Sequence, residues 1–165
     1  MAQNVIWVID TSSVIEIRRS VENSVKSHVF SQMGILVNGG RLVFPKQVVD
    51  ELERAADLES PDAQYKWAKQ HEEKATESAP SLEEVKEILR NVPKVLDPDK
   101  DSGAEEADPY VLAAGVRLRA EGKDARIVTE ETKDIPRKMS LRTAAGLLGV
   151  PSVPLKAFLQ FEVIV

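Results

Sequence analysis

The chain of 165 residues has no cysteine and only two histidines. The lack of cysteine excludes a disulfide framework and any thiolate metal site, and it is consistent with a reducing cytoplasm. Two histidines offer little material for an imidazole metal site or a histidine-dependent triad. No apolar run approaches the roughly 20 residues that span a bilayer, and no basic region precedes an apolar run at the N-terminus. We therefore expect a cytoplasmic protein without a signal peptide and without a membrane partner.

Positive charge is also scarce, because 22 Lys and Arg face 27 Asp and Glu for a formal net charge of −5. Proteins that bind nucleic acid broadly through charge are usually basic, so this balance argues against that class. It is compatible with an enzyme that gathers carboxylates in one site and bridges them to phosphate through metal. The length fits a single domain, residues 1–165, and the chain contains no internal repeat and no linker long enough to divide it.

Hydrophobic patterning predicts strands that alternate with helices. Residues 5–9 form an unbroken apolar run, typical of a strand covered on both faces, and shorter runs predict strands at 42–44, 125–129 and 152–153. Apolar periodicity and capping residues predict helices at 12–19, 22–38, 46–57, 61–77, 81–91, 107–121 and 140–149. This alternation predicts an α/β fold with three layers, α/β/α, around a central parallel sheet of four to five strands.

Local signals add detail to this outline. Ser12 or Ser13 and Asn23 are candidate caps of the first two helices, and Ser81 to Glu84 has the pattern of a capping box. The charged residues 61–77 predict an exposed helix within a helical insertion at about 59–91. Residues 93–103 are predicted to form a loop, and the apolar tail 155–165 is ambiguous.

Acidic residues follow the predicted strands. In an open parallel sheet, ligands bind beyond the carboxyl ends of the strands. Asp10 directly follows the first strand, and Glu130 and Glu131 follow the third. Glu51 lies one to two turns into the helix after the second strand, and Asp108 lies near the start of the helix that leads into the third. Because Mg²⁺ and Mn²⁺ prefer oxygen ligands, the combination predicts a site for one or two such ions.

Each acid also has a purely structural explanation. Asp10 is a favoured N-cap residue, although Ser12 and Ser13 can serve equally well. Asp108 precedes Pro109, as an N-cap residue often does when Pro occupies the first helical position. For both, the sequence leaves capping and metal binding open.

The remaining acids are even less specific when taken singly. Glu51 lies in the acidic run 50–53, and such runs usually form a solvated helix face. Glu105 and Glu106 suit the first turn of a helix, where acids complement the dipole. Glu130 and Glu131 could be ordinary loop residues. The metal-site hypothesis therefore depends on the combination of acids at strand ends.

Four segments together resemble the PIN-domain family, which includes the VapC-type toxins. The segments are VIDTSSVI at 8–15, FPKQVVDEL at 44–52, ADPYVLAA at 107–114 and IVTEE at 127–131. They follow the family's order and extend over nearly the whole chain. The resemblance implies a PIN-like parallel α/β sheet and metal-dependent endoribonuclease activity. It also implies an RNA substrate, frequent homodimerisation and often a cognate antitoxin.

Carried over by motif, the resemblance implies that Asp10, Glu51 and Asp108 hold Mg²⁺ or Mn²⁺, with Glu131 as the fourth acid. The fourth motif usually carries Asp, so the Glu at position 131 is a departure, and Asp134 is an alternative fourth ligand. A second departure is the helical insertion, which is longer and more charged than in the smallest toxins.

Other side chains are candidates for supporting roles around these acids. The hydroxyls of Ser12 and Thr129 are expected to orient carboxylates or waters. Five basic residues are candidates for phosphate contacts at the rim, with ordinary surface charge as the alternative: Arg18, Arg19, Lys46, Arg137 and Lys138. Trp7 and Trp67 are expected to pack in the core rather than stack on bases.

Two other functions compete with a nuclease. A haloacid-dehalogenase-like phosphatase would use Asp10 as a nucleophile, but that family has a second Asp two positions later, where this chain has Ser12. A catalytically weak PIN-fold binding or regulatory module is the other alternative, and the acidic charge and Glu131 favour it slightly.

Overall fold

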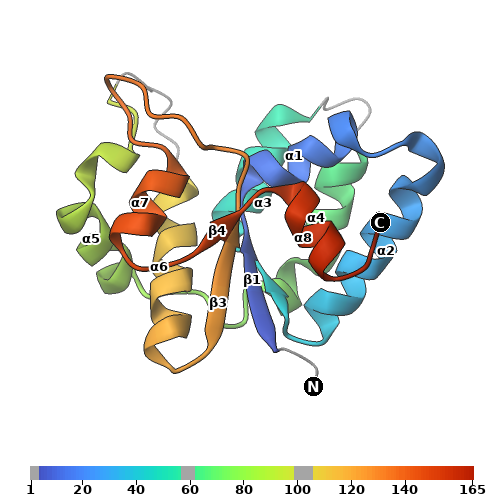
Figure 1. Ribbon diagram of the computed structural model, residues 1–165, viewed down its shortest axis with the longest axis horizontal. Helices are drawn as coiled ribbons and strands as arrows, with labels where there is room; N and C mark the ends of the chain where they lie inside the picture. The colour runs from blue at the N-terminus through green and yellow to red at the C-terminus, as the bar shows by residue number, and fades with distance from the viewer. Residues whose placement is uncertain (1–3, 57–61, 99–105) are drawn as a thin grey trace.

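The computed structural model describes residues 4–56, 62–98 and 106–165. Four strands form one sheet in the order β2-β1-β3-β4, and every pairing is parallel. The strands are β1 (Val5–Ile9), β2 (Leu42–Val43), β3 (Asp124–Val128) and β4 (Ser152–Val153). The predicted α/β class and the four-stranded parallel sheet are therefore confirmed (Figure 1).

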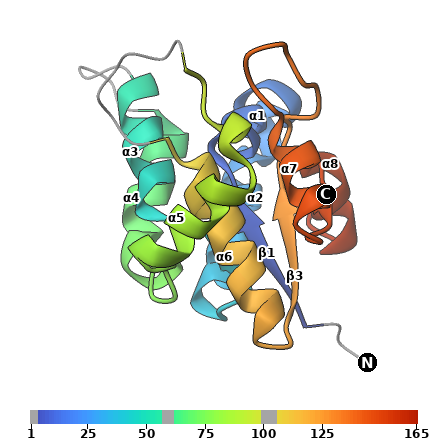
Figure 2. The same cartoon turned by 90° about the vertical axis from the view of Figure 1, so that its left-hand side faces the viewer.

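Helices cover both faces of this sheet. On one face lie α1 (Thr11–Ser20), α2 (Asn23–Asn38), α3 (Lys46–Ala55), α4 (Ala63–Ala75) and α8 (Leu155–Phe161), and on the other lie α5 (Leu82–Asn91), α6 (Asp108–Ala120) and α7 (Leu141–Leu147) (Figure 1). A view turned by 90° shows α5 beside α6, and α3 beside α4 (Figure 2). The three-layer α/β/α arrangement follows from this distribution.

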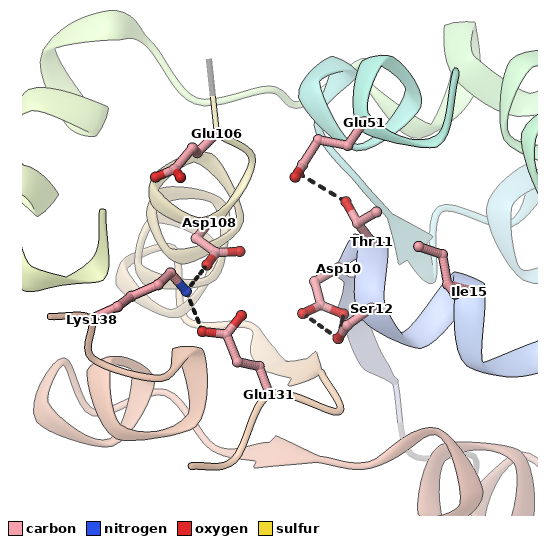
Figure 3. Close-up of a pocket in the computed structure, with 9 residues that line it drawn as sticks. All are labelled: Asp10, Thr11, Ser12, Ile15, Glu51, Glu106, Asp108, Glu131 and Lys138. Carbon is pink, nitrogen blue, oxygen red and sulfur yellow. Dashed lines mark hydrogen bonds and ion pairs between the residues drawn. The ribbon is translucent and has the colours of Figure 1, made fainter. Parts of the chain in front are cut away.

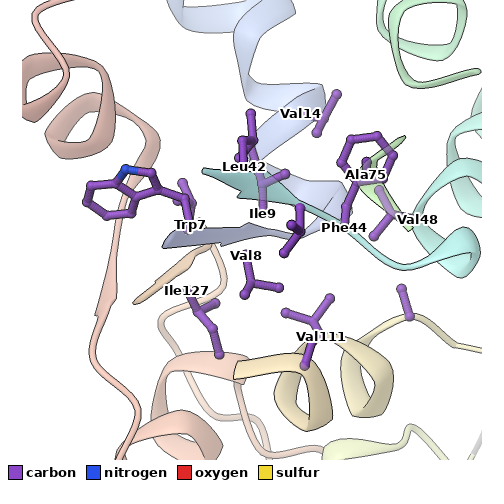
Figure 4. Close-up of a cluster of buried hydrophobic side chains, with 14 of the residues drawn as sticks. Trp7, Val8, Ile9, Val14, Leu42, Phe44, Val48, Ala75, Val111 and Ile127 are labelled. Atoms are coloured by element: carbon purple, nitrogen blue, oxygen red, sulfur yellow. The ribbon is translucent and has the colours of Figure 1, made fainter. Parts of the chain in front are cut away.

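The core forms around β1, as its unbroken apolar run predicts. Side chains alternate along a strand, so Ile9 points toward Val14 and Phe44 on one face, while Val8 points toward Ile127 and Val111 on the other (Figure 4). Burial of both faces removes a large apolar area from water at roughly 25 cal/mol per Å². This burial fixes the register of the sheet, and the register fixes which residues meet at its carboxyl edge.

Several predicted helix boundaries and caps are wrong. The N-cap of α1 is Asp10 rather than Ser12 or Ser13, and α2 is preceded by Glu22 instead of being capped by Asn23. In α6 the N-cap is Ala107, and Asp108 is the first helical residue. Asp10 caps α1 with its own carboxylate, whereas Glu22 and Ala107 make no side-chain capping hydrogen bond, so backbone geometry alone sets the starts of α2 and α6.

Three further segments depart from expectation. Trp67 is buried in the core as predicted, and because Gln64 and Ala68 are buried with it, the α4 helix is amphipathic rather than exposed. Within the predicted loop 93–103, Pro93–Val95 form a short 3₁₀ helix, η1, that buries Val95. The ambiguous tail contains α8, and the predicted start of α4 at Pro61 lies outside the described residues.

The capping box at Ser81 is confirmed, because Ser81 and Glu84 exchange hydrogen bonds between side chain and backbone. Ser140 caps α7 as predicted, although that helix ends at Leu147 rather than Gly149. In the part of the chain that the structure describes, no helix has the length and apolar character needed to cross a membrane.

Candidate metal centre

The sheet brings Asp10 and Thr129 together at its carboxyl edge. Ile9 at the end of β1 pairs with Val128 at the end of β3, so the next residue of each strand emerges at the same level. The Asp10 N–H donates to the Val128 carbonyl at 3.1 Å. The Thr129 hydroxyl donates to Asp10 Oδ2 at 2.6 Å, which joins the two strand ends through their side chains.

Three further hydrogen bonds hold the Asp10 carboxylate. The Ser12 hydroxyl lies 2.8 Å from Oδ1 and 2.9 Å from Oδ2, and the Ser13 N–H donates to Oδ1 at 2.9 Å. Ser12 is positioned in turn by the Glu130 N–H, which donates to its oxygen at 3.0 Å. Asp10 is therefore the N-cap of α1, which confirms the capping alternative, and its carboxylate is held in place at the pocket, where metal binding stays a prediction.

Burial makes Asp10 an unusual acid. Loss of solvent raises the pKa of Asp10 to about 7, and the nearby Asp108 adds to that rise, although hydrogen bonds from Thr129, Ser13 and Ser12 oppose it. Only 1 % of the residue surface is exposed. A carboxylate buried so completely is costly to ionise, and a cation beside it would lower that cost.

Asp108 and Glu131 complete a group of three acids with Asp10. Asp108 comes from the first turn of α6, and Glu131 follows β3, where its N–H donates to Thr129 Oγ1 at 3.0 Å. One oxygen of each carboxylate lies within 4.8 Å of the others, close enough for a shared cation (Figure 3). Burial, followed by repulsion from Asp108, raises the pKa of Glu131, while Lys138 opposes the rise.

Glu51 lies in the same pocket but outside this group of three. Its Oε1 accepts the Thr11 hydroxyl at 3.0 Å and the Ala107 N–H at 3.1 Å. Glu51 therefore ties α3 to the starts of α1 and α6. Figure 3 shows it across the pocket from Glu131, with Asp10 and Asp108 between them.

The cavity has a volume of about 250 Å³ and is strongly acidic. Its lining includes five carboxylic acids, Asp10, Glu51, Glu106, Asp108 and Glu131. The sequence predicted Glu106 only as an acid that complements a helix dipole. The structure shows that Glu106 also lines the cavity. The signal that could have identified it is its position two residues before Asp108, at the same helix start.

Lys138 is the unexpected member of the site. Its Nζ lies 3.0 Å from Asp108 Oδ2 and also contacts Glu131 Oε1, so one ammonium joins two of the three acids. Burial lowers the pKa of Lys138, but attraction to Asp108 and Glu131 outweighs it and raises the pKa above the ordinary value. The residue was predicted as a phosphate contact at the rim, whereas the structure places it inside the pocket (Figure 3).

The other four predicted basic residues do not line the cavity. Arg18 and Arg19 are exposed in the last turn of α1. Lys46 pairs with Asp50 at 3.2 Å on the surface of α3, and Arg137 pairs with Asp97 at 3.3 Å. Their surroundings give no support to a role in the pocket itself.

Two acids near the site have structural roles instead. Asp134, the alternative fourth ligand, accepts the Ser140 N–H at 2.8 Å before α7, and hydrogen bonds from Ser140 and Thr143 lower its pKa. Glu130 accepts the Leu155 N–H at 2.6 Å, at the start of α8. Neither residue lines the cavity, and the group of three acids contains Glu131 rather than Asp134.

Comparison with known proteins gives a family but no activity. A protein-family model described as "Domain of unknown function (DUF4411)" matches residues 7–164, and the chain belongs to this family. No curated protein matches the chain.

Proposed function

We propose that this member of the DUF4411 family is a Mg²⁺- or Mn²⁺-dependent endoribonuclease of the PIN type, which hydrolyses phosphodiester bonds at the acidic pocket. The observation that carries the proposal is the convergence of Asp10, Asp108 and Glu131 within 4.8 Å of one another. These residues come from three distant segments, and all three lie in motifs that resemble the PIN family.

The donor set fits a hard divalent cation. The three acids offer only oxygen, which Mg²⁺ and Mn²⁺ prefer, and no sulfur or imidazole lines the described pocket. The buried Asp10 gains most from such an ion, because burial raises its pKa. A divalent ion bound there would supply an acidified water and offset charge on the phosphodiester.

The chain's own residues would position that chemistry. Ser12 and Thr129 fix the Asp10 carboxylate through hydroxyl donors, and outer partners of this kind commonly change metal affinity by 10- to 100-fold. Glu51 faces the pocket from α3 and fixes the start of α6, from which Asp108 projects. Thus Asp10, Asp108 and Glu131 are the proposed ligands, and Glu51 acts beside them.

An RNA substrate is part of the proposal because of the four motifs. The net charge of −5 fits an enzyme whose attraction for phosphate is supplied by metal rather than by a basic surface. Homodimerisation and pairing with an antitoxin are predictions of the same resemblance, whereas a place in the cytoplasm is predicted from the lack of cysteine and of a signal peptide. Co-purification with a small partner encoded beside it would support the toxin role.

A second candidate is a non-catalytic PIN-fold binding module. The observation that favours it is Lys138, whose ammonium already lies against Asp108 and Glu131. In such a protein the pocket would be held together by its own cation, and divalent ions would bind weakly.

RNA cleavage in the presence of Mn²⁺ separates the two candidates. Wild type should cleave a mixed single-stranded RNA, and Asp10→Asn and Asp108→Asn should each lose about 100-fold or more in rate. The matched control is Asp124→Asn, since this exposed acid lies at the opposite end of β3 and should leave the rate unchanged. Equal cleavage by all four proteins would place the activity elsewhere, and no cleavage by wild type would favour the binding module.

A further inference from the structure

The Lys138 ammonium lies between two of the acids that could bind a metal ion. It lies 3.0 Å from Asp108 Oδ2 and contacts Glu131 Oε1, and these two acids belong to the group that could share a metal. The side chains are largely buried, with 17 % of Lys138, 17 % of Asp108 and 29 % of Glu131 exposed. This is a shielded ion pair rather than a surface contact, so its electrostatic attraction is screened little by solvent.

The charges around Lys138 are strongly unbalanced. Five carboxylic acids line the cavity, and Lys138 is the single basic residue among the described residues that line it. One ammonium cannot compensate such a group, so the pocket still attracts further positive charge. A divalent cation that approached Asp108 and Glu131 would meet oxygens already in contact with Lys138.

The backbone beneath Lys138 is fixed, whereas its side chain is long. Ile135 and Lys138 exchange two backbone hydrogen bonds of 3.0 and 3.1 Å, and the adjacent Met139 N–H donates to the Lys94 carbonyl at 2.7 Å. The bridge and this anchor to η1 hold the main chain in place. Any displacement of the ammonium is therefore a rotation of the four-carbon stem, which needs no movement of the loop.

We propose that Lys138 is an internal counter-cation that competes with the divalent ion for Asp108 and Glu131 and, once displaced, binds the phosphate of the RNA. The inference rests on the metal-dependent nuclease function proposed above. Displacement leaves the ammonium at the wall of the same pocket, where the phosphate of a bound RNA would come within its reach. Lys138 thus lowers the affinity for free metal and raises the affinity for substrate.

This role predicts effects of opposite sign from one substitution. Lys138→Met keeps an unbranched stem but removes the charge, so Mn²⁺ should bind about tenfold more tightly because no ammonium has to leave. The same change should raise the KM for RNA, because a phosphate partner is lost. A residue that only supported the pocket would weaken both interactions together.

The experiment measures Mn²⁺ binding to the RNA-free full chain by titration calorimetry. Lys138→Arg retains the charge and should bind Mn²⁺ like wild type, and Lys133→Met, in the same exposed loop, controls for the general loss of a positive charge. Thermal unfolding with and without Mn²⁺ checks that each variant folds. The metal-dependent rise in Tm should be larger for Lys138→Met than for wild type.

Each outcome decides the proposal. Tighter Mn²⁺ binding by Lys138→Met alone supports it, including the case in which wild type binds too weakly to measure. Equal or weaker Mn²⁺ binding by Lys138→Met overturns the role of Lys138. The proposed nuclease function survives that result if wild type binds Mn²⁺ and Asp108→Asn does not. If neither wild type nor Lys138→Met binds Mn²⁺, the metal site and the role of Lys138 both fail.

Discussion

The hydroxyl of Thr129 lies 2.6 Å from Asp10 Oδ2 and joins the carboxyl ends of the two central strands. The same oxygen accepts the Glu131 N–H at 3.0 Å, so Thr129 connects two of the three acids that could share a metal. One side chain at the end of β3 therefore sets the distance between Asp10 and the segment that carries Glu131.

Removal of this hydroxyl should loosen the site without unfolding the protein. Thr129→Val keeps the shape of the side chain but removes the shortest hydrogen bond to Asp10 Oδ2. Because this bond positions a proposed ligand, Mn²⁺ affinity should fall about tenfold. Titration calorimetry measures the change. Thr76→Val, at the end of α4, is the control and should bind as wild type does. Unchanged affinity in Thr129→Val would mean that Thr129 does not position a ligand.

The pH dependence of stability should reveal the buried Asp10. Burial raises the pKa of Asp10 from 3.8 to about 7, so the folded state retains a proton that the unfolded state releases between these values. This contribution to stability is present in full below pH 4 and is lost as the pH rises through 7, by as much as about 4 kcal/mol. Chemical denaturation of the metal-free protein across this range measures the slope.

Asp10→Asn should flatten that slope, since the amide does not titrate. Mn²⁺ should flatten it in wild type as well, because a bound cation favours the ionised carboxylate. Asp124→Asn should retain the wild-type slope toward neutral pH, because the hydrogen bond from Arg126 lowers the pKa of Asp124 and its own effect lies at the acid end of the range. Identical slopes in wild type and Asp10→Asn would contradict the raised pKa.

Glu51 should matter less for metal than Asp108 does. Glu51→Gln can still accept the hydrogen bonds of Thr11 and Ala107 through its amide oxygen, and Glu51 lies outside the group of three acids. We expect Mn²⁺ affinity to fall only a few-fold in Glu51→Gln, but about 100-fold in Asp108→Asn. Calorimetry on the two variants side by side tests this order. A larger loss in Glu51→Gln would make Glu51 a direct ligand.

Ser13 offers a test of stability that does not involve the metal. Its hydroxyl is buried and, among the described residues, has no hydrogen-bond partner. Ser13→Ala removes that unsatisfied group and keeps the N–H that Asp10 accepts, so the free energy of unfolding should stay the same or rise by about 1 kcal/mol. A loss of more than about 1 kcal/mol on denaturation would reveal a partner for the hydroxyl.

Much of the fold could be predicted because apolar patterning determines it. The run Val5–Ile9 has no polar position, so it predicted a strand buried on both faces and thereby the central place of β1. The helix α4 was harder, because the burial of Trp67 could be predicted but the segment is otherwise mostly charged, and tertiary packing decides that Gln64 and Ala68 are buried beside it. Capping residues were misplaced by one to three positions because a helix can begin without a capping side chain, as α2 does at Glu22 and α6 at Ala107.

Some residues of the site could likewise be predicted from the sequence, and others could not. Asp10 and Asp108 could be identified because they adjoin recognisable elements, the end of a strand and the start of a helix with Pro at its second position. Glu130 and Glu131 are adjacent and identical in type, and only the structure shows that Glu130 accepts the Leu155 N–H while Glu131 faces the pocket. The role of Lys138 has no signal in the sequence, because it depends on how the loop after β3 brings Lys138 to Asp108 at the start of α6.

A crystal structure of wild type soaked in Mn²⁺, with anomalous diffraction to locate the ion, tests the central claim most directly. We predict a Mn²⁺ peak coordinated by Asp10, Asp108 and Glu131, with the Lys138 ammonium withdrawn from these oxygens. A pocket in which Lys138 still joins Asp108 and Glu131 at saturating Mn²⁺, with no ion beside Asp10, would contradict the account.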